Sequence, residues 1–239
     1  ENGAGKSTLI KIISGIYTPT SGELFFENKK VSIKDSRGAK QIGISLIPQE
    51  FNLIPELNAF ENIFLGKEYI KKNKLLNKKA MISKTKALFE ELHCDIQPTQ
   101  KIFSLSAAQK QMIECAKALA YESKLLIMDE PSTMLTKNEI VVLFDIMLKL
   151  KQKGVTIIYI SHKLKEIKDI CDRVMVLRDG MLIDIKNTSQ IDEKEMATKM
   201  VGRELNQIFP PKTIPSDEVV FEVKDLEVDN ILHNINFNL

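Results

Sequence analysis

The sequence predicts an α/β protein in which helices cover both faces of a parallel sheet. Three observations indicate this class. A glycine-rich turn, ENGAGKS, leads into an apolar helix at the start of the chain. Two short apolar runs, KLLIMDE (124–130) and VTIIYISH (155–162), have the composition of strands buried on both faces. A helical segment separates these runs, and strands that alternate with helices are typical of α/β sheets.

The first half of the chain supplies the early elements. Apolar side chains recur at helical spacing after the glycine-rich turn, and residues 23–33 predict a hairpin that turns at Asn28-Lys29. The run IGISLIPQ (42–49) indicates a short strand. Residues 56–92 are rich in lysine and show helical periodicity, and a further helix is expected over about 108–121.

The second half continues the alternation of strands and helices. Thr136 and Glu139 have the spacing of a capping box, which predicts a helix that begins there and stops at Gly154. Residues 173–185 contain an Asp-Gly turn between apolar runs and therefore predict a hairpin. A last helix is expected over roughly 192–201.

Shifts in composition divide the chain into a large first domain, a linker and part of another domain. The first domain is expected to span residues 1–205, with a lysine-rich helical subdomain inserted at about 50–108. Residues 206–218 contain three prolines and few apolar side chains, which is typical of a linker. Residues 219–239 alternate like strands, and we interpret them as the truncated start of a second domain.

Charge and composition exclude several classes of protein. The 34 basic and 32 acidic residues leave a net charge of +2, so no nucleic-acid partner is expected. The lysines between 67 and 86 favour a solvated helical face over a nucleic-acid or lipid contact. No apolar run approaches the ~20 residues of a membrane span. The three scattered cysteines lack metal-ligand spacing and favour a reduced, cytosolic setting; they are Cys94, Cys115 and Cys171.

The glycine-rich turn contains the second half of a phosphate-binding loop, G-x-x-x-x-G-K-[ST]. Gly5, Lys6 and Ser7 fill that half, and the first glycine would fall one residue before Glu1. Backbone amides in such a turn form an anion site, at which the following helix points its positive end. Lys6 is expected to reach the β- and γ-phosphates and the Ser7 hydroxyl to bind Mg²⁺; the alternative is an ordinary turn before a buried helix. The expected phosphate-binding residues are Asn2, Gly3, Ala4, Gly5, Lys6, Ser7 and Thr8.

Polar side chains at the predicted strand ends are the candidates for catalysis, because open α/β sheets bind ligands at the carboxyl ends of their strands. Asp129 is expected to hold the metal through water, and Glu130 to polarise the attacking water. His162 could donate a hydrogen bond to the γ-phosphate, and Gln49 could contact Mg²⁺ or water. Each of these residues also has a non-functional alternative. Asp129 and Glu130 could be a surface pair, His162 an ordinary loop histidine and Gln49 an isolated glutamine.

Taken in this order, these segments strongly resemble the nucleotide-binding domain of ABC ATPases. ENGAGKST is similar to the Walker A loop, IPQ to the Q-loop, LLIMDEP to the Walker B segment and SH to the switch histidine. The resemblance covers about residues 1–205. It implies a P-loop NTPase fold: a RecA-like core with a parallel sheet, a small antiparallel β part and an inserted helical subdomain that docks onto membrane partners. It also implies ATP and Mg²⁺ as cofactors, with the metal near Ser7, Gln49 and Asp129.

The segment FSLSAAQKQMIECAKALA matches the position of the family signature, which is usually LSGGQ. In the family this segment presents a helix N-terminus to the ATP held by the opposite domain. Ser106 suits an N-cap, but the methyl groups of Ala107 and Ala108 would hinder close approach or a positive φ where two glycines are usual. The phosphate clamp is therefore in question, whereas the site built on Lys6 should be competent. The residues concerned are Ser106, Ala107, Ala108 and Gln109.

Longer stretches such as NLIPELNAFENIFLGKE and KMVGRELNQIFPPK resemble the first half of bacterial monosaccharide-import ATPases. That group serves ribose, galactose or methylgalactoside, and xylose, and carries two fused nucleotide-binding domains. The resemblance implies ATP hydrolysis that drives sugar import through membrane permease subunits, with an extracytoplasmic sugar-binding protein as an indirect partner. We expect a peripheral protein on the cytoplasmic face of the bacterial membrane. The chain would be a piece that lacks most of its second nucleotide-binding domain and has little ATPase activity alone.

Two other functions stay open at this stage. A soluble ABC-type translation factor would act on ribosomes, but such proteins generally join their domains with a long, basic, helical linker, and this joint is short and proline-bearing. A non-hydrolytic ATP-binding regulator is kept open by the Ala-Ala signature, although intact Asp129, Glu130 and His162 argue against it.

Overall fold

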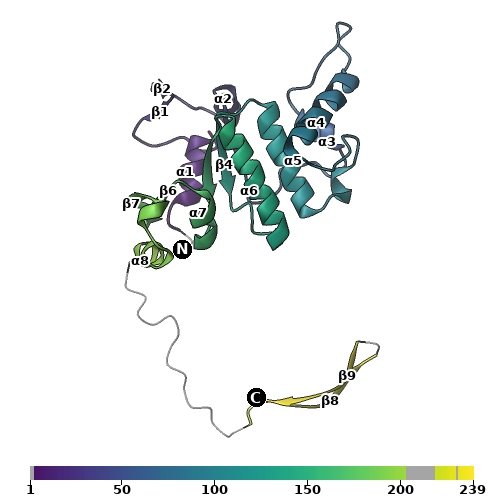
Figure 1. Cartoon of the computed structure of the whole chain (residues 1–239), viewed down its shortest axis with the longest axis vertical. Coiled ribbons are helices and arrows are strands. Elements are labelled where there is room, and N and C mark those ends of the chain that lie inside the picture. Colours follow the sequence, from purple (N-terminus) through teal and green to yellow (C-terminus); the bar gives the residue numbers. More distant parts are fainter. Residues whose placement is uncertain (1–2, 203–218, 230) are drawn as a thin grey trace. The chain divides into compact units, whose positions relative to one another are not determined.

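The computed structural model describes residues 3–202, 219–229 and 231–239 (Figure 1). The chain divides into two compact units, Glu1–Glu204 and Leu205–Leu239, which are described separately below. Within the described residues, no helix combines the length and apolar character needed to cross a bilayer.

A three-stranded parallel sheet forms the centre of the first unit. Its strands are β3 (Ile44–Ile47), β4 (Leu125–Asp129) and β5 (Thr156–Ile160), in the order β3-β4-β5. The register pairs Ile47 with Met128 and Asp129 with Ile160, so the carboxyl ends of the three strands reach one edge. The parallel sheet predicted from the apolar runs is confirmed.

Eight α-helices are described in the first unit, and several begin at a side-chain cap. Ser106 with Gln109, and Thr136 with Glu139, each form a capping box, as the spacing of Thr136 and Glu139 predicted. Gly154 takes a positive φ of 83° just after the second of these helices, where the sequence predicted its end. The helices are α1 (Lys6–Ile13), α2 (Ser36–Gln41), α3 (Ala59–Ile63), α4 (Lys78–Leu92), α5 (Ala107–Ala120), α6 (Lys137–Gln152), α7 (Leu164–Ile170) and α8 (Glu193–Val201), with 3₁₀ turns at Ile102–Ser104 and Thr188–Gln190.

Two antiparallel hairpins complete the first unit. The strands β6 (Arg173–Arg178) and β7 (Met181–Asn187) turn at the predicted Asp-Gly pair. The other hairpin joins β1 (Leu24–Phe26) to β2 (Lys29–Val31), and the predicted turn at Asn28-Lys29 is wrong by one residue. Glu27 and Asn28 occupy the turn with φ of 50° and 60°, since a two-residue turn of this kind needs positive φ at both positions.

Helices cover both faces of the sheet, as expected for this fold class. Successive residues of β4 face opposite sides. Leu126 and Met128 belong to the larger core, together with Leu143 of α6. Ile127 belongs to the smaller core, where it packs with Ile10 of α1. The helix that follows the glycine-rich turn is therefore anchored to the sheet on one face, and α6 on the other.

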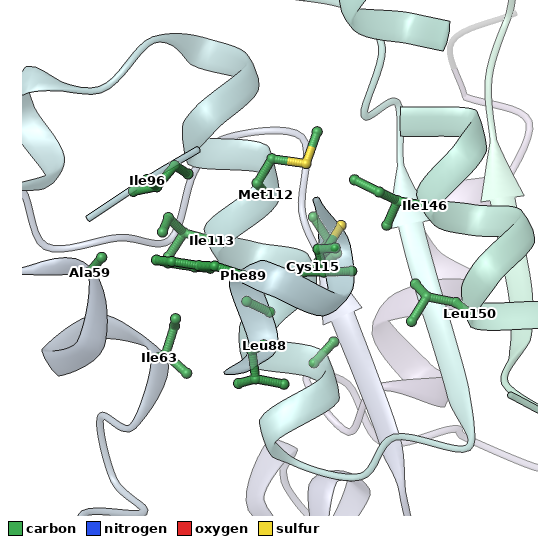
Figure 2. Packing of buried hydrophobic residues seen from close by; sticks show 14 of the residues in the cluster. Ala59, Ile63, Leu88, Phe89, Ile96, Met112, Ile113, Cys115, Ile146 and Leu150 are labelled. Atoms are coloured by element: carbon green, nitrogen blue, oxygen red, sulfur yellow. The ribbon is translucent and has the colours of Figure 1, made fainter. Parts of the chain in front are cut away.

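The lysine-rich stretch forms helices α3 and α4, which pack on α5. Figure 2 shows Ile63 of α3, Leu88 and Phe89 of α4, and Ile113 of α5 directed toward one another. These side chains are at most 5 % exposed, so the stretch has a core that is continuous with the larger core of the sheet. The inserted helices thus share one hydrophobic core with α5.

The second unit contains the two strands expected after residue 219. β8 (Glu222–Val228) pairs antiparallel with β9 (Leu232–Asn238), and the rings of Phe221 and Phe237 lie 6.0 Å apart. The predicted linker at 206–218 lies outside the described residues, and so does Asn2 of the expected phosphate loop. The division into a first domain, a linker and a second domain stays a prediction.

Candidate nucleotide-binding site

The glycine-rich loop turns into α1 through two left-handed glycines. Gly3 and Gly5 have φ of 91° and 92°, a conformation that side chains disfavour. The loop packs against the β6–β7 turn, because the Gly180 amide donates to the Ala4 carbonyl at 3.3 Å. A Cβ on Gly5 would lie 3.3 Å from the Cα of Gly180. Both the backbone conformation and this close approach therefore require glycine at position 5.

The start of α1 has the properties of an anion site. Gly5 is the N-cap and supplies no side-chain acceptor, and the first turn of α1 contains no acidic residue. The N-cap therefore gives no side-chain hydrogen bond to the amides of the first turn, and no acid in that turn offsets the positive end of the helix dipole. Such an end binds phosphate well.

Asp129 lies at the end of β4 within electrostatic reach of the loop. Burial and the neighbouring charge of Glu130 raise the pKa of Asp129 above its ordinary value, while the ammonium groups of Lys6 and Lys11 act in the opposite direction. Lys6 and Lys11 both belong to α1. The Asp129 carboxylate at the end of β4 therefore lies within electrostatic reach of two lysines of α1.

Glu130 is held between two of the other predicted residues. Gln49 Nε2 donates to Glu130 Oε2 at 3.4 Å, and His162 Nδ1 lies 3.3 Å from Glu130 Oε1. The Glu130 side chain is 22 % exposed and that of His162 is 60 % exposed, so the pair opens to solvent on the histidine side. The three strands thus bring together residues that are 32 and 81 positions from Glu130 in the sequence.

Comparisons with known proteins show which family has this arrangement. The family model described as ABC transporter matches residues 1–133, which is more than half of the chain. This chain belongs to the ABC transporter family. The ATP-binding cassette MJ1267 in its ADP conformation superposes with a TM-score of 0.69 at 28 % identity, covering 82 % of this chain and 80 % of that one. CbiO1 from Clostridium perfringens, at 24 % identity and TM-score 0.69, covers 83 % and 79 % and shares the fold.

Curated relatives of this ABC cassette cover its whole length. The galactose/methyl galactoside import ATP-binding protein MglA of Clostridium perfringens (strain SM101) is 43 % identical over 240 residues, 46 % of its own length. MglA of Mannheimia succiniciproducens is 45 % identical over 241 residues, 47 % of its length. A putative ribose/galactose/methyl galactoside import ATP-binding protein of Geobacillus kaustophilus is 44 % identical over 246 residues, 48 % of its length. The chain spans about half the length of the curated relatives it matches.

The signature segment of the cassette forms the start of α5. Ser106 Oγ accepts from the Gln109 amide at 3.2 Å, and Gln109 Oε1 accepts from the Ser106 amide at 3.0 Å. Ala107 and Ala108 begin the helix with ordinary negative φ, so this conformation does not require glycine. Any effect of the two alanines on nucleotide approach therefore comes from their methyl groups and not from their backbone.

The residues present fit a magnesium–nucleotide complex. The Ser7 hydroxyl, the Asp129 carboxylate and the Gln49 amide offer hard oxygen donors, and Mg²⁺ is usually held by few protein oxygens together with phosphate oxygens. No cluster of three or more metal-ligating His, Cys, Asp or Glu side chains occurs among the described residues.

Sequence reasoning missed the buried polar side chains that hold the segment after Gln49. Asn62 is fully buried, accepts from the Ile54 amide at 2.8 Å and donates to the Ile54 carbonyl at 3.1 Å. Glu114 accepts from the Asn52 amide at 3.0 Å, and burial raises the pKa of Glu114. The only sequence signal was a polar residue on an otherwise apolar helix face. These contacts connect the segment that follows Gln49 to α3 and α5.

Proposed function

We propose that this chain binds and hydrolyses ATP to energise the import of a monosaccharide of the ribose, galactose or xylose class. The observation that carries the proposal is the Glu130 carboxylate, which lies 3.4 Å from Gln49 and 3.3 Å from His162 at the carboxyl ends of the parallel strands. The curated relatives named as galactose, methyl galactoside or ribose import proteins support the sugar class.

Each residue has a chemical role in this proposal. Lys6 and the amides at the start of α1 bind the phosphates of ATP, and Ser7 and Asp129 hold the Mg²⁺, which neutralises charge on the β- and γ-phosphates when bound. Glu130 polarises the attacking water and accepts its proton. His162 donates to the γ-phosphate and orients the same water, and Gln49 detects whether the γ-phosphate is present.

The proposed assembly requires other chains or domains. The Ser106 end of α5 would face the ATP held by a second nucleotide-binding domain of the full-length protein. Helices α3 and α4 would dock onto membrane permease subunits, and an extracytoplasmic sugar-binding protein would deliver the sugar. The chain would then work at the cytoplasmic face of the bacterial membrane as a peripheral protein.

The proposal is tested by Glu130→Gln in the full-length protein assembled with its permease. This change keeps the size and the contacts with Gln49 and His162 but removes the base, so ATP hydrolysis should fall by about a hundredfold or more. ATP binding should persist, and uptake across a panel of pentoses and hexoses should stop. Asp145→Asn, an exposed change of the same type on α6, should leave hydrolysis and uptake unchanged.

Three outcomes would contradict the proposal. Unchanged hydrolysis by Glu130→Gln would remove the catalytic role of this site. Tight ATP binding by the wild-type protein without hydrolysis would indicate a non-hydrolytic regulator, and co-sedimentation with ribosomes without sugar uptake would indicate a translation factor.

A further inference from the structure

A buried carboxylate that the proposed mechanism does not use lies on α7. Glu166 is 8 % exposed, and its Oε2 accepts hydrogen bonds from Ser132 Oγ and Tyr159 OH, both at 2.6 Å. Ser161 Oγ donates to the same oxygen at 3.4 Å, and Lys163 Nζ lies 3.1 Å from Oε1. One anion therefore binds four side chains from two segments of the chain, one after β4 and one at the end of β5.

These partners flank the two residues proposed to act on ATP. Ser132 follows Glu130 by two positions, and Ser161 and Lys163 stand on either side of His162. Lys163 Nζ also donates to the Ser132 carbonyl at 3.1 Å, which joins the two segments directly. Glu166 itself touches neither Glu130 nor His162 in any hydrogen bond or ion pair of the described residues.

The partners of Glu166 favour its charged form. Burial alone would raise the pKa of Glu166, but hydrogen bonds from Ser132, Tyr159 and Lys163 outweigh it and hold that pKa below its ordinary value. A buried anion is costly unless its partners stay in place. The segment after Glu130 and the segment around His162 therefore cannot separate without removing the Ser132 hydrogen bond from this buried carboxylate.

We propose that Glu166 is a positioning residue for ATP hydrolysis, which sets the spacing between Glu130 and His162 by binding the segment that carries each. This inference rests on the proposed function. Glu166 acts through the two residues and contributes no group to the reaction. A network that only stabilises the fold would change the amount of folded protein but not the turnover of each folded molecule.

The first test is Glu166→Gln in the full-length protein, with steady-state kinetics normalised to the ATP-binding stoichiometry. The amide turns a donor toward hydroxyl groups that need an acceptor, so kcat should fall by about tenfold while KM for ATP stays unchanged. Asp169→Asn removes an exposed carboxylate from the same helix and should leave kcat unchanged. An unchanged kcat in Glu166→Gln, or a loss explained entirely by fewer binding-competent molecules, would overturn the inference.

The second test combines the change with His162→Ala and uses single-turnover assays with γ-labelled ATP. If Glu166 acts by placing His162 and Glu130, Glu166→Gln should cost less than about twofold once His162 is absent, because residues that act as a unit are non-additive. The same tenfold cost in both backgrounds would contradict the positioning role. Tyr159→Phe removes one donor and keeps the ring, so it provides the same comparison if Glu166→Gln does not fold.

Comparing the hydrolysis rates of Glu130→Gln and Glu166→Gln separates this inference from the proposed function. If Glu130→Gln abolishes hydrolysis but Glu166→Gln has no effect, only the role of Glu166 is wrong. If Glu130→Gln leaves the rate unchanged, the proposed function has failed, and with it the reaction that Glu166 was inferred to support.

Discussion

Glu130 adopts a left-handed backbone with φ of 49°, which is uncommon for a residue with a side chain. Such a conformation costs about 1–3 kcal/mol and persists only where surrounding contacts hold it. The Glu130 amide donates to the Ile160 carbonyl at 2.9 Å, and Thr133 Oγ1 donates to the Glu130 carbonyl at 3.0 Å. These contacts at the end of β4 hold the carboxylate between Gln49 and His162, so the backbone strain is part of the site.

Asn62 provides a test of how the segment after Gln49 is held. Asn62→Leu has a similar size but removes the buried side chain that bonds both the amide and the carbonyl of Ile54. The free energy of unfolding of this chain should fall by about 2–3 kcal/mol, measured by urea denaturation. Asn62→Asp keeps the acceptor and loses the donor, so its effect should be smaller at low pH, where the carboxyl is neutral.

The matched control for Asn62 is Asn73→Ala. Asn73 is exposed and makes one local hydrogen bond to the Leu75 amide at 3.3 Å, so its loss should change stability by less than about 0.5 kcal/mol. Equal changes in the free energy of unfolding would show that the Asn62 hydrogen bonds to Ile54 stabilise the chain no more than an exposed local hydrogen bond does.

At the scale of elements, the phosphate loop and α1 are positioned by glycine. Gly5→Ala places a Cβ 3.3 Å from the Gly180 Cα in a left-handed conformation, so the loop must shift from the anion site. The affinity of this chain for a fluorescent ATP analogue should fall by about tenfold or more, because close backbone approach to phosphate requires glycine.

Gly154→Ala separates backbone strain from ligand binding. Gly154 also has a positive φ, of 83°, but a Cβ there would meet nothing within 4 Å. The change should lower stability by about 1 kcal/mol and leave the affinity for ATP unchanged. Equal loss of ATP affinity in both variants would show that the Gly5 effect is only destabilisation.

Most helices and strands were predicted from short sequence patterns, because the caps and turns that bound them depend on neighbouring residues. The capping box at Thr136 and the positive-φ Gly154 mark both ends of α6 within a single stretch of sequence. The β1–β2 turn was misplaced by one residue because Asn28-Lys29 and Glu27-Asn28 offer similar turn chemistry. Its register was settled by the pairing of Leu24 with Val31 and Phe26 with Lys29 across the hairpin.

At the scale of the whole molecule, the described chain holds both a phosphate loop and a signature helix. The hydrogen bonds at the start of α5 join Ser106 to Gln109, and none in the described part of the chain joins Ser106 to Glu130. In the proposed function, this end of α5 would face the ATP held by a second cassette.

The dependence on a second cassette can be measured by comparing this chain with the full-length protein. Hydrolysis per molecule should be at least about tenfold slower for this chain at equal concentration. In the proposed function, ATP is bound between two cassettes, and catalysis needs both of them held in place. The rate per molecule should rise with concentration as two copies meet. Vigorous turnover that is independent of concentration would contradict the two-cassette arrangement.

The sequence by itself determined the chemistry of the site. The phosphate loop and the three strand ends are local patterns, and parallel strands necessarily bring their carboxyl ends to one edge. Only the tertiary structure decided what holds these residues in place. The partners Ser132 and Glu166 are 34 positions apart, and Asn52 and Glu114 are 62 apart. No local pattern encodes such pairs, because a buried polar contact exists only after the helices have packed against the sheet.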